Sequence, residues 1–433
     1  MKAEQLKQKL QGKRSVQLMK ELYGDGAVQE NMLRYQRLID KFRERFDDQE
    51  LFLFSAPGRT EISGNHTDHN HGKVLAASIN LDCVGVAAKN HSPLVHIISE
   101  TYEQDFTIDL NQLEPSVHKS GTNDLVRGLL KGFLDSGYEI GGFDAYITSN
   151  VINSAGVSSS AAFEMLFCSI LNEFYNDGRM NSIAYAHIGK YAENNYWEKA
   201  SGLLDQMACA VGGLIAIDFT RPLVPVVKKI AFDFPSAGHS LMIVQTGKGH
   251  ADLSADYSSV PDEMKKVAGY FGREVCAEIT EEQVISHLAA VRAHAGDRSV
   301  MRALHFFEEN KRVDEEVKAL REGRFADFLA NITASGNSSW KWLQNCYTNS
   351  NYQEQGISIA LALTELFIAK KQKGACRIHG GGFAGVIMAI LPDDLAGEYT
   401  TYMERAMEEG GVYRMSIRPY GAVCVNNLIH DKG

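Results

Sequence analysis

The sequence lacks the features that mark secreted and membrane-spanning proteins. Its seven cysteines include no Cys-x-x-Cys pair and their number is odd, so we expect reduced thiols in a cytoplasmic protein. No apolar run reaches the roughly 18 residues that a membrane-spanning helix needs. The charged N-terminus lacks the apolar core of a signal peptide, and we expect no such peptide.

Basic runs are also scarce, which argues against a nucleic-acid partner. The formal net charge is −10, and one short basic region lies at residues 2–14. An acidic balance does not exclude phosphate ligands, because a binding site is a local feature. These properties favour a soluble monomer that binds neither nucleic acid nor membrane.

What the sequence does contain is an ordinary globular composition, with 44% hydrophobic and 23% charged residues. The length of 433 residues predicts two or three domains. Helical patterns fill residues 1–48, with a break near 24–26, and a mixture of strands and helices follows. We predict the α+β class in two domains, residues 1–222 and 223–433, with the seam at the proline-containing stretch 221–226.

Apolar periodicity and turn residues locate the expected elements. The stretch LFLFSAPGR, residues 51–59, predicts a strand that enters a Pro-Gly loop. Further strands are expected at 74–88, 94–99, 143–151, 213–219, 240–246 and 386–391. Helices are expected at 123–137, 161–175, 184–197, 202–211, 261–273, 281–293, 299–321 and 356–371.

The stretch GNHTDHNHG, residues 64–72, holds three histidines and an aspartate in nine positions. His66, His69 and His71 could bind zinc, because histidine-rich tracts often bind metals. A loop offers no helical i, i+4 geometry, however, and no cysteine pattern accompanies it. A loop that holds another kind of ligand is the favoured interpretation.

Two glycine-containing loops could bind anions. Residues 153–162, NSAGVSSSAA, lie between a predicted strand and a predicted helix, where free backbone N–H groups and the helix dipole favour phosphate. A serine-rich helix cap is the alternative. Residues 379–385, HGGGFAG, match G-x-G-x-x-G, but a helix precedes them and a strand follows, so a tight helix-to-strand turn is the alternative there.

Several segments together resemble one family. APGRTEISGNHTDHNHG (56–72) resembles the galactokinase signature, and SAGVSSSAA (154–162) resembles the phosphate loop of the GHMP small-molecule kinases. HGGGFAG (379–385) is similar to the third motif of that superfamily. AENNYWEKASGLLDQMA (192–208) and RALHFFEENKRV (302–313) resemble further galactokinase segments. The resemblance implies the GHMP kinase fold, with the active site between two domains.

The resemblance implies an ATP-dependent sugar 1-kinase, with galactose as the default substrate. Asp205 would be the base for the anomeric hydroxyl, and Arg59 would keep it ionised and stabilise the phosphoryl group; a purely structural ion pair is the alternative. Tyr257 is the least certain of the alignments, an ordinary half-buried tyrosine being the other interpretation. The residues that would contact the sugar are Asn65, His66, Asp68, Gly202 and Tyr257.

The resemblance also implies a nucleotide site with magnesium. Ser160 and Glu193 would bind Mg²⁺ through hard oxygen atoms. The residues that would hold the ATP phosphates are Ala155, Gly156, Val157, Ser158, Ser159 and Ser160.

The chain departs from the galactokinase signature within residues 56–72. The loop of this segment, residues 64–72, is called the sugar loop. Where the family has an amide and then an acid, this sequence has Glu61 and then Asn65. Loss of the acid at position 65 suggests a substrate altered at carbon six, such as galacturonate, although Glu61 could restore the charge. Ile152, Ser154 and His69 also differ from the family pattern. A non-catalytic sugar sensor is a further alternative, which the presence of Arg59, Ser160, Glu193 and Asp205 disfavours.

Overall fold

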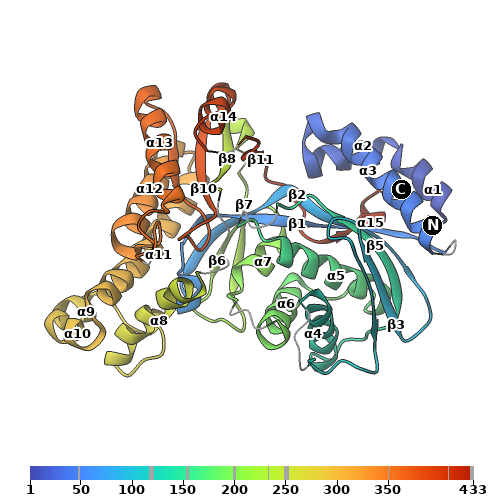
Figure 1. Ribbon diagram of the computed structural model, residues 1–433, viewed down its shortest axis with the longest axis horizontal. Coiled ribbons are helices and arrows are strands. Elements are labelled where there is room, and N and C mark those ends of the chain that lie inside the picture. Colours follow the sequence, from blue (N-terminus) through green and yellow to red (C-terminus); the bar gives the residue numbers. More distant parts are fainter. Residues whose placement is uncertain are drawn as a thin grey trace.

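The computed structural model describes residues 1–46, 49–116, 121–152, 156–197, 201–232, 234–247, 253–349, 351–407 and 409–429. These residues form two sheets with helices packed around them (Figure 1). The mixture of helix and sheet confirms the α+β class. In this part of the chain, no helix is both long enough and apolar enough to cross a membrane.

The larger sheet has the strand order β12-β1-β2-β5-β3-β4, and the long strand β2 also pairs with β6, which pairs with β7. Most pairs are antiparallel, and β3 and β5 are parallel. The bounds are β1 Phe52–Ser63, β2 Lys73–Lys89, β3 Leu94–Ser99, β4 Gln104–Asp109, β5 Phe143–Ser149, β6 Leu214–Asp218, β7 Val226–Ile230 and β12 Val423–Cys424.

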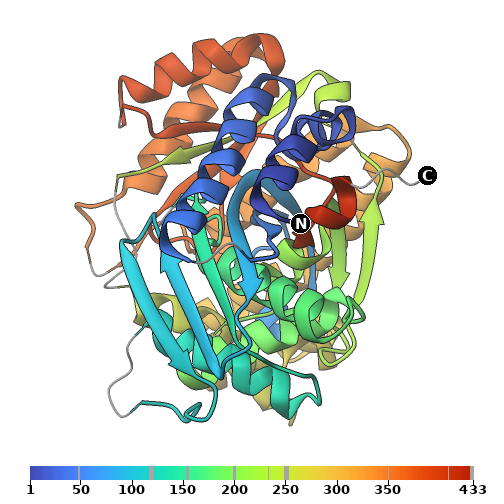
Figure 2. The ribbon, with the colours of Figure 1, turned by 90° about the vertical axis from the view of Figure 1, so that its right-hand side faces the viewer.

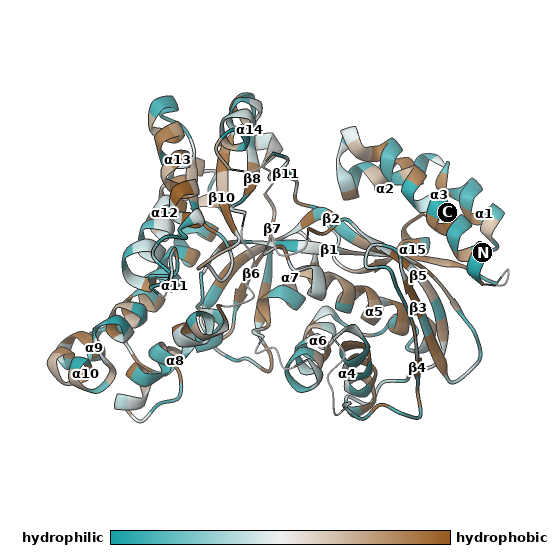
Figure 3. Cartoon of the chain, in the orientation of Figure 1, coloured by the Kyte–Doolittle hydropathy of each residue, from teal (hydrophilic) through white to brown (hydrophobic). Residues whose placement is uncertain are grey.

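Both faces of this sheet are covered, because alternate strand residues are apolar on each side. Leu53, Val84 and Val86 pack with α1 (Ala3–Leu10), α2 (Lys13–Tyr23) and α3 (Val28–Arg45). Phe54 and Ala87 belong to the core on the opposite face. Figures 2 and 3 show α1–α3 over one face and the apolar strands beneath them. The helices of the opposite face are α4 Thr122–Asp135, α5 Ser159–Tyr175, α6 Ser182–Tyr196 and α7 Leu204–Val211.

The buried carboxylate of Asp82 binds side chains from segments near both ends of the chain and so links these segments to the first sheet. Asp82 of β2 accepts hydrogen bonds from Tyr23 (2.6 Å), Arg34 (2.7 Å) and Arg418 (3.1 Å). Burial alone would raise the pKa of Asp82, but the two guanidinium groups outweigh it and lower the pKa. The N-terminal helices are therefore an integral layer of the first sheet.

The smaller sheet is antiparallel and has the order β11-β8-β10-β9. Its strands are β8 His239–Gln245, β9 Ala375–Ile378, β10 Val386–Pro392 and β11 Val412–Met415. The helices of this half are α8 Ser254–Tyr270, α9 Glu281–Ser286, α10 Leu288–Ala295, α11 Asp297–Arg321, α12 Phe325–Ser338, α13 Gly356–Lys371 and α14 Ala396–Glu404; α15 Asn426–Ile429 ends the described chain.

Several expected elements differ in the structure. β1 continues through Pro57 and Gly58, where the register with β2 shifts, so the expected Pro-Gly loop is wrong. The sequence analysis missed the short strands β4, β7 and β9 and the helices α12, α14 and α15. The single helix expected at 281–293 is two helices, α9 and α10. Because β9 precedes residues 379–385, that loop joins two strands and is not a helix-to-strand turn.

The first sheet extends past residue 222, because β7 pairs with β6. Residues 423–424 return to it and pair with β1. The division into residues 1–222 and 223–433 stays a prediction.

Candidate active site

Arg59 of β1 and Asp205, in the first turn of α7, form an ion pair. Nε and Nη2 of Arg59 both donate to Oδ1 of Asp205, at 2.8 Å and 2.6 Å. The Arg59 side chain is 8% exposed and that of Asp205 30% exposed. Burial alone would lower the pKa of Arg59, but the Asp205 and Glu61 carboxylates outweigh it and raise the pKa. The pair therefore presents a charged guanidinium and an accessible carboxylate.

The phosphate-loop segment holds this pair in place. Ser158 donates to the second oxygen of Asp205, Oδ2, at 2.5 Å. Arg59 donates from its side chain to the carbonyl of Gly156 and from its backbone to that of Val157. Each oxygen of the Asp205 carboxylate therefore has a fixed donor, which orients it.

Residues 156–160 lead into helix α5, whose first turn offers backbone N–H groups and the positive end of the helix dipole. Gly156 has a φ of +63° and Ser158 a φ of +61°. Val157 is fully buried and packs into the core beneath the loop. Ala155 lies outside the described residues. The remaining predicted phosphate-binding residues, Gly156 to Ser160, lie together at this helix start.

Ser160 and Glu193 lie side by side, as a shared metal ligand set requires. Ser160 donates to Oε1 of Glu193 at 3.0 Å, and Gln206 donates to Oε2 at 3.0 Å. Ser201 also donates to this carboxylate. One carboxylate and one hydroxyl are the hard oxygen donors that Mg²⁺ prefers. The sequence analysis missed the positions of Gln206 and Ser201 around Glu193.

The sugar loop brings Asp68 against a glycine. A Cβ atom on Gly202 would lie 2.1 Å from Oδ2 of Asp68, so only glycine allows this approach. Asp68 begins a short 3-10 turn, Asp68–Asn70. Tyr257 donates its hydroxyl to the carbonyl of Gly382 at 2.9 Å. Asp68 thus packs closely against Gly202, and Tyr257 is held by the backbone of Gly382.

His66 is a neutral side chain in the same loop. Burial lowers its pKa to about 4. A neutral ring has one N–H, and the contact of Nε2 with the Gly381 carbonyl at 2.7 Å requires that proton on Nε2. Nδ1 is then an acceptor. The described residues contain no group of three or more His, Cys, Asp or Glu side chains that could hold a metal, so the zinc alternative for His66, His69 and His71 gains no support.

The Arg59–Asp205 pair and the predicted sugar contacts His66, Asp68, Gly202 and Tyr257 line a cavity of about 210 Å³. Liquid water occupies about 30 Å³ per molecule, so the cavity suits a ligand about as large as one sugar ring. It is lined by Arg59, Glu61, His66, Asp68, His69, Ser201, Gly202, Leu204, Asp205, Gln206, Tyr257, Gly380 and Gly381.

Asn65 does not line this cavity but lies behind the residues that do. Its side chain is fully buried, and its amide group donates to Glu61 at 2.9 Å and to the Gly380 carbonyl at 2.6 Å. Its oxygen accepts from Asn345 at 2.7 Å. The structure therefore places Glu61, and not Asn65, among the described residues that line the cavity.

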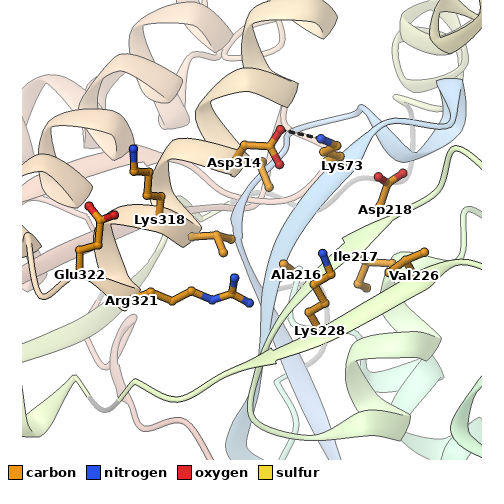
Figure 4. Close-up of a pocket in the computed structure, with 12 residues that line it drawn as sticks. Lys73, Ala216, Ile217, Asp218, Val226, Lys228, Asp314, Lys318, Arg321 and Glu322 are labelled. Carbon is orange, nitrogen blue, oxygen red and sulfur yellow. Dashed lines mark hydrogen bonds and ion pairs between the residues drawn. The ribbon is translucent and has the colours of Figure 1, made fainter.

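A second groove, of about 530 Å³, lies between α11 and strands β6 and β7 (Figure 4). An ion pair of 2.5 Å between Lys73 and Asp314 lies at its edge. Arg321 of α11 and Lys228 of β7 point into it from opposite sides. None of the predicted site residues lines this groove.

Two family models match the chain. The galactokinase galactose-binding signature matches residues 40–89, and the N-terminal domain of GHMP kinases matches residues 124–213. The galactokinase of Actinobacillus pleuropneumoniae serotype 5b (strain L20) is 29% identical over 363 residues, which cover 83% of this chain and 90% of that protein. The galactokinase of Lactococcus lactis subsp. lactis (strain IL1403) is 27% identical over 400 residues, which cover 88% and 94%.

Solved structures agree with these matches. The crystal structure of Lactococcus lactis galactokinase complexed with galactose superimposes with a TM-score of 0.76 and 25% identity, over 90% of this chain and 100% of that one. A mevalonate kinase superimposes with a TM-score of 0.57 and 16% identity, over 84% and 98%. The latter similarity shows a shared fold.

Proposed function

We propose that the chain is a galactokinase-like member of the GHMP kinase superfamily and that it is an ATP-dependent sugar 1-kinase. The reaction would move the γ-phosphoryl group of ATP to the anomeric hydroxyl of galactose or a close relative, giving the sugar 1-phosphate and ADP. The observation that carries the proposal is the Asp205 carboxylate, oriented by Arg59 and Ser158 in the wall of a sugar-sized cavity beside the phosphate loop.

The proposed role of Asp205 is to accept the proton of the anomeric hydroxyl as the phosphoryl group is transferred. A carboxylate can act so only while it is ionised, and the adjacent Arg59 guanidinium favours the ionised form. The same guanidinium, fixed by its bond to the Gly156 carbonyl, would stabilise the charge that develops on the phosphoryl oxygens. The backbone at residues 156–160 would bind the other phosphates.

The donor set at Ser160 and Glu193 fits Mg²⁺, which would neutralise phosphate charge when bound with the nucleotide. Gln206 and Ser201 hold the Glu193 carboxylate from the other side and fix its orientation. Asp68, His66, Gly202 and Tyr257 are the proposed sugar contacts of this chain.

An ADP-release assay with Mg-ATP tests the proposal over galactose, N-acetylgalactosamine, galacturonate, arabinose, fucose and glucose. Galactose or a close relative should give turnover that Asp205→Asn lowers by about 10²- to 10⁴-fold, the usual effect of losing a general base. Asn keeps the shape and the acceptor for Arg59, so sugar binding should persist. Sugar binding without turnover in the wild-type protein would identify a sensor instead of an enzyme.

We further propose that the protein acts as a cytoplasmic monomer. All seven cysteines lie in the described residues as free, buried thiols, the state that a reducing compartment maintains. Light scattering of the purified protein should give the mass of one chain, 47.9 kDa. A dimer mass would contradict the monomer.

A further inference from the structure

We propose that Glu61 accepts a hydrogen bond from a substrate hydroxyl and restricts the cavity to uncharged sugars. The inference rests on the proposed sugar kinase function and names a specificity residue for it. It places at Glu61 the substrate contact that the loop sequence suggested for Asn65.

The strand geometry directs Glu61 to the cavity. Arg59 and Glu61 are two residues apart on β1, and their pairing with β2 is regular, Arg59 opposite Ser78 and Glu61 opposite Ala76. Side chains two apart on a strand lie on the same face. Both residues line the cavity, so Glu61 shares a wall with the residue that holds Asp205.

The hydrogen bonds of Glu61 leave one carboxylate oxygen for a ligand. Asn65 and Arg377 both donate to Oε1, each at 2.9 Å. The Arg377 guanidinium is fully buried and also donates to the Ile62 carbonyl at 2.7 Å, so it cannot follow a moving carboxylate. The backbone N–H of Glu61 is held by Nε2 of His379 at 3.1 Å. The described residues thus fix Oε1 and donate no hydrogen bond to Oε2, the oxygen that remains for a substrate hydroxyl.

The charges around the cavity favour a neutral ligand. Its lining contains the carboxylates of Glu61, Asp68 and Asp205 and the guanidinium of Arg59, which is paired with Asp205. Arg377 pairs with Glu61 from behind the lining, so the three carboxylates outnumber the two guanidinium groups by one. His66 adds no charge at neutral pH, because burial lowers its pKa to about 4. A carboxylate on the substrate would meet like charges in this cavity. The cavity therefore fits a polyhydroxylated neutral sugar and disfavours a uronic acid such as galacturonate.

Asn65 lies behind the residues that line the cavity and holds the Glu61 carboxylate in position. Its amide nitrogen is committed to Oε1 of Glu61 and to the Gly380 carbonyl, and its oxygen to Asn345. Relative to the galactokinase signature, the acid and the amide have exchanged positions 61 and 65. The carboxylate that accepts from the ligand therefore lies on strand β1, at Glu61, and not on the loop, at Asn65. Asn65 is a positioning residue in this arrangement.

The test compares Glu61→Gln with the wild-type enzyme on galactose, on 2-, 3-, 4- and 6-deoxygalactose, and on galacturonate. Glutamine retains an acceptor for Asn65 and Arg377, so the fold should persist, and thermal unfolding checks that it does. We expect kcat/KM for galactose to fall about tenfold or more, mainly through KM, because a charged acceptor is lost. For one deoxygalactose the two enzymes should be nearly equal, since the hydroxyl that Glu61 contacts is then missing. Discrimination against galacturonate should weaken in the variant.

An equal loss on every sugar, or a change below twofold on galactose, would overturn the proposal. Glu315→Gln, an exposed position on α11, is the matched control and should match the wild type. If the wild-type protein phosphorylates no sugar, the proposed function fails, and calorimetric binding of galactose decides the inference. Weaker galactose binding by Glu61→Gln would then support it, whereas equal binding, or none by either protein, would overturn it.

Discussion

Replacing Gly202 with alanine should cripple sugar turnover without unfolding the protein. The added Cβ would lie 2.1 Å from Oδ2 and 3.1 Å from Cγ of Asp68, whereas ordinary contacts begin near 3.4 Å. The Asp68 carboxylate must therefore move by about 1 Å or more. The Asp68 side chain can move in this way at small cost in stability. The substitution should therefore change mainly the position of the carboxylate that binds the ligand.

Displacement of a substrate-positioning group by about 1 Å can cost about 10²-fold in rate. We therefore expect Gly202→Ala to lower kcat/KM for the sugar by about that factor, with KM raised because Asp68 contacts the ground state as well. The ADP-release assay over a range of sugar concentrations measures both constants. KM for ATP should change little.

The matched control is Gly269→Ala. Gly269 lies in α8, and a Cβ there would meet nothing within 4 Å. This substitution should leave kcat/KM unchanged and raise stability by up to about 1 kcal/mol, since alanine favours a helix. If Gly202→Ala kept sugar turnover within twofold of the wild type, the assignment of Asp68 to the sugar would be refuted.

Three further perturbations test other parts of the structure. Burial lowers the pKa of His305 to about 4, so below about pH 6.5 the unfolded chain binds a proton that the folded chain does not. Stability should therefore fall by about 2 kcal/mol between pH 7.5 and 5 from this residue, and urea unfolding of His305→Gln should lack that loss. Glu193→Gln should raise the Mg²⁺ concentration for half-maximal activity at least about tenfold; an unchanged Mg²⁺ titration would exclude Glu193 as a ligand. Arg34→Ala should cost about 3 kcal/mol in urea unfolding, because it leaves Asp82 with one cation fewer, whereas Arg43→Ala, which breaks an exposed pair, should cost under about 1 kcal/mol.

The parts of the fold with long apolar patterns could be predicted from the sequence. The strand 94–99 and the helix 356–371 appear at the expected residues. Strands β7 and β9 were missed because five and four residues carry too little periodicity, and neighbouring strands specify them instead. Pro57 suggested a loop, but a shift of register lets β1 continue past it.

The sequence likewise predicted only some residues of the candidate site correctly. The family resemblance implied Arg59 and Asp205, and the structure brings them to 2.6 Å. The resemblance also implied Asn65, since a motif fixes a position in the chain but not the direction of its side chain. The period of two along β1 would have identified Glu61 from Arg59, had the strand not been ended at the Pro-Gly pair.

The buried Asp82 has a consequence for the order in which the chain can fold during synthesis. Its carboxylate lies in the first third of the sequence, while Arg418 and the edge strand β12 emerge near the end. A nascent chain that stops before residue 418 leaves Asp82 with Arg34 as its one cationic partner among the described residues and leaves an edge of β1 unpaired. The first sheet is therefore completed only after the second half has been made, so the first half cannot reach its final structure while the second half is still being synthesised.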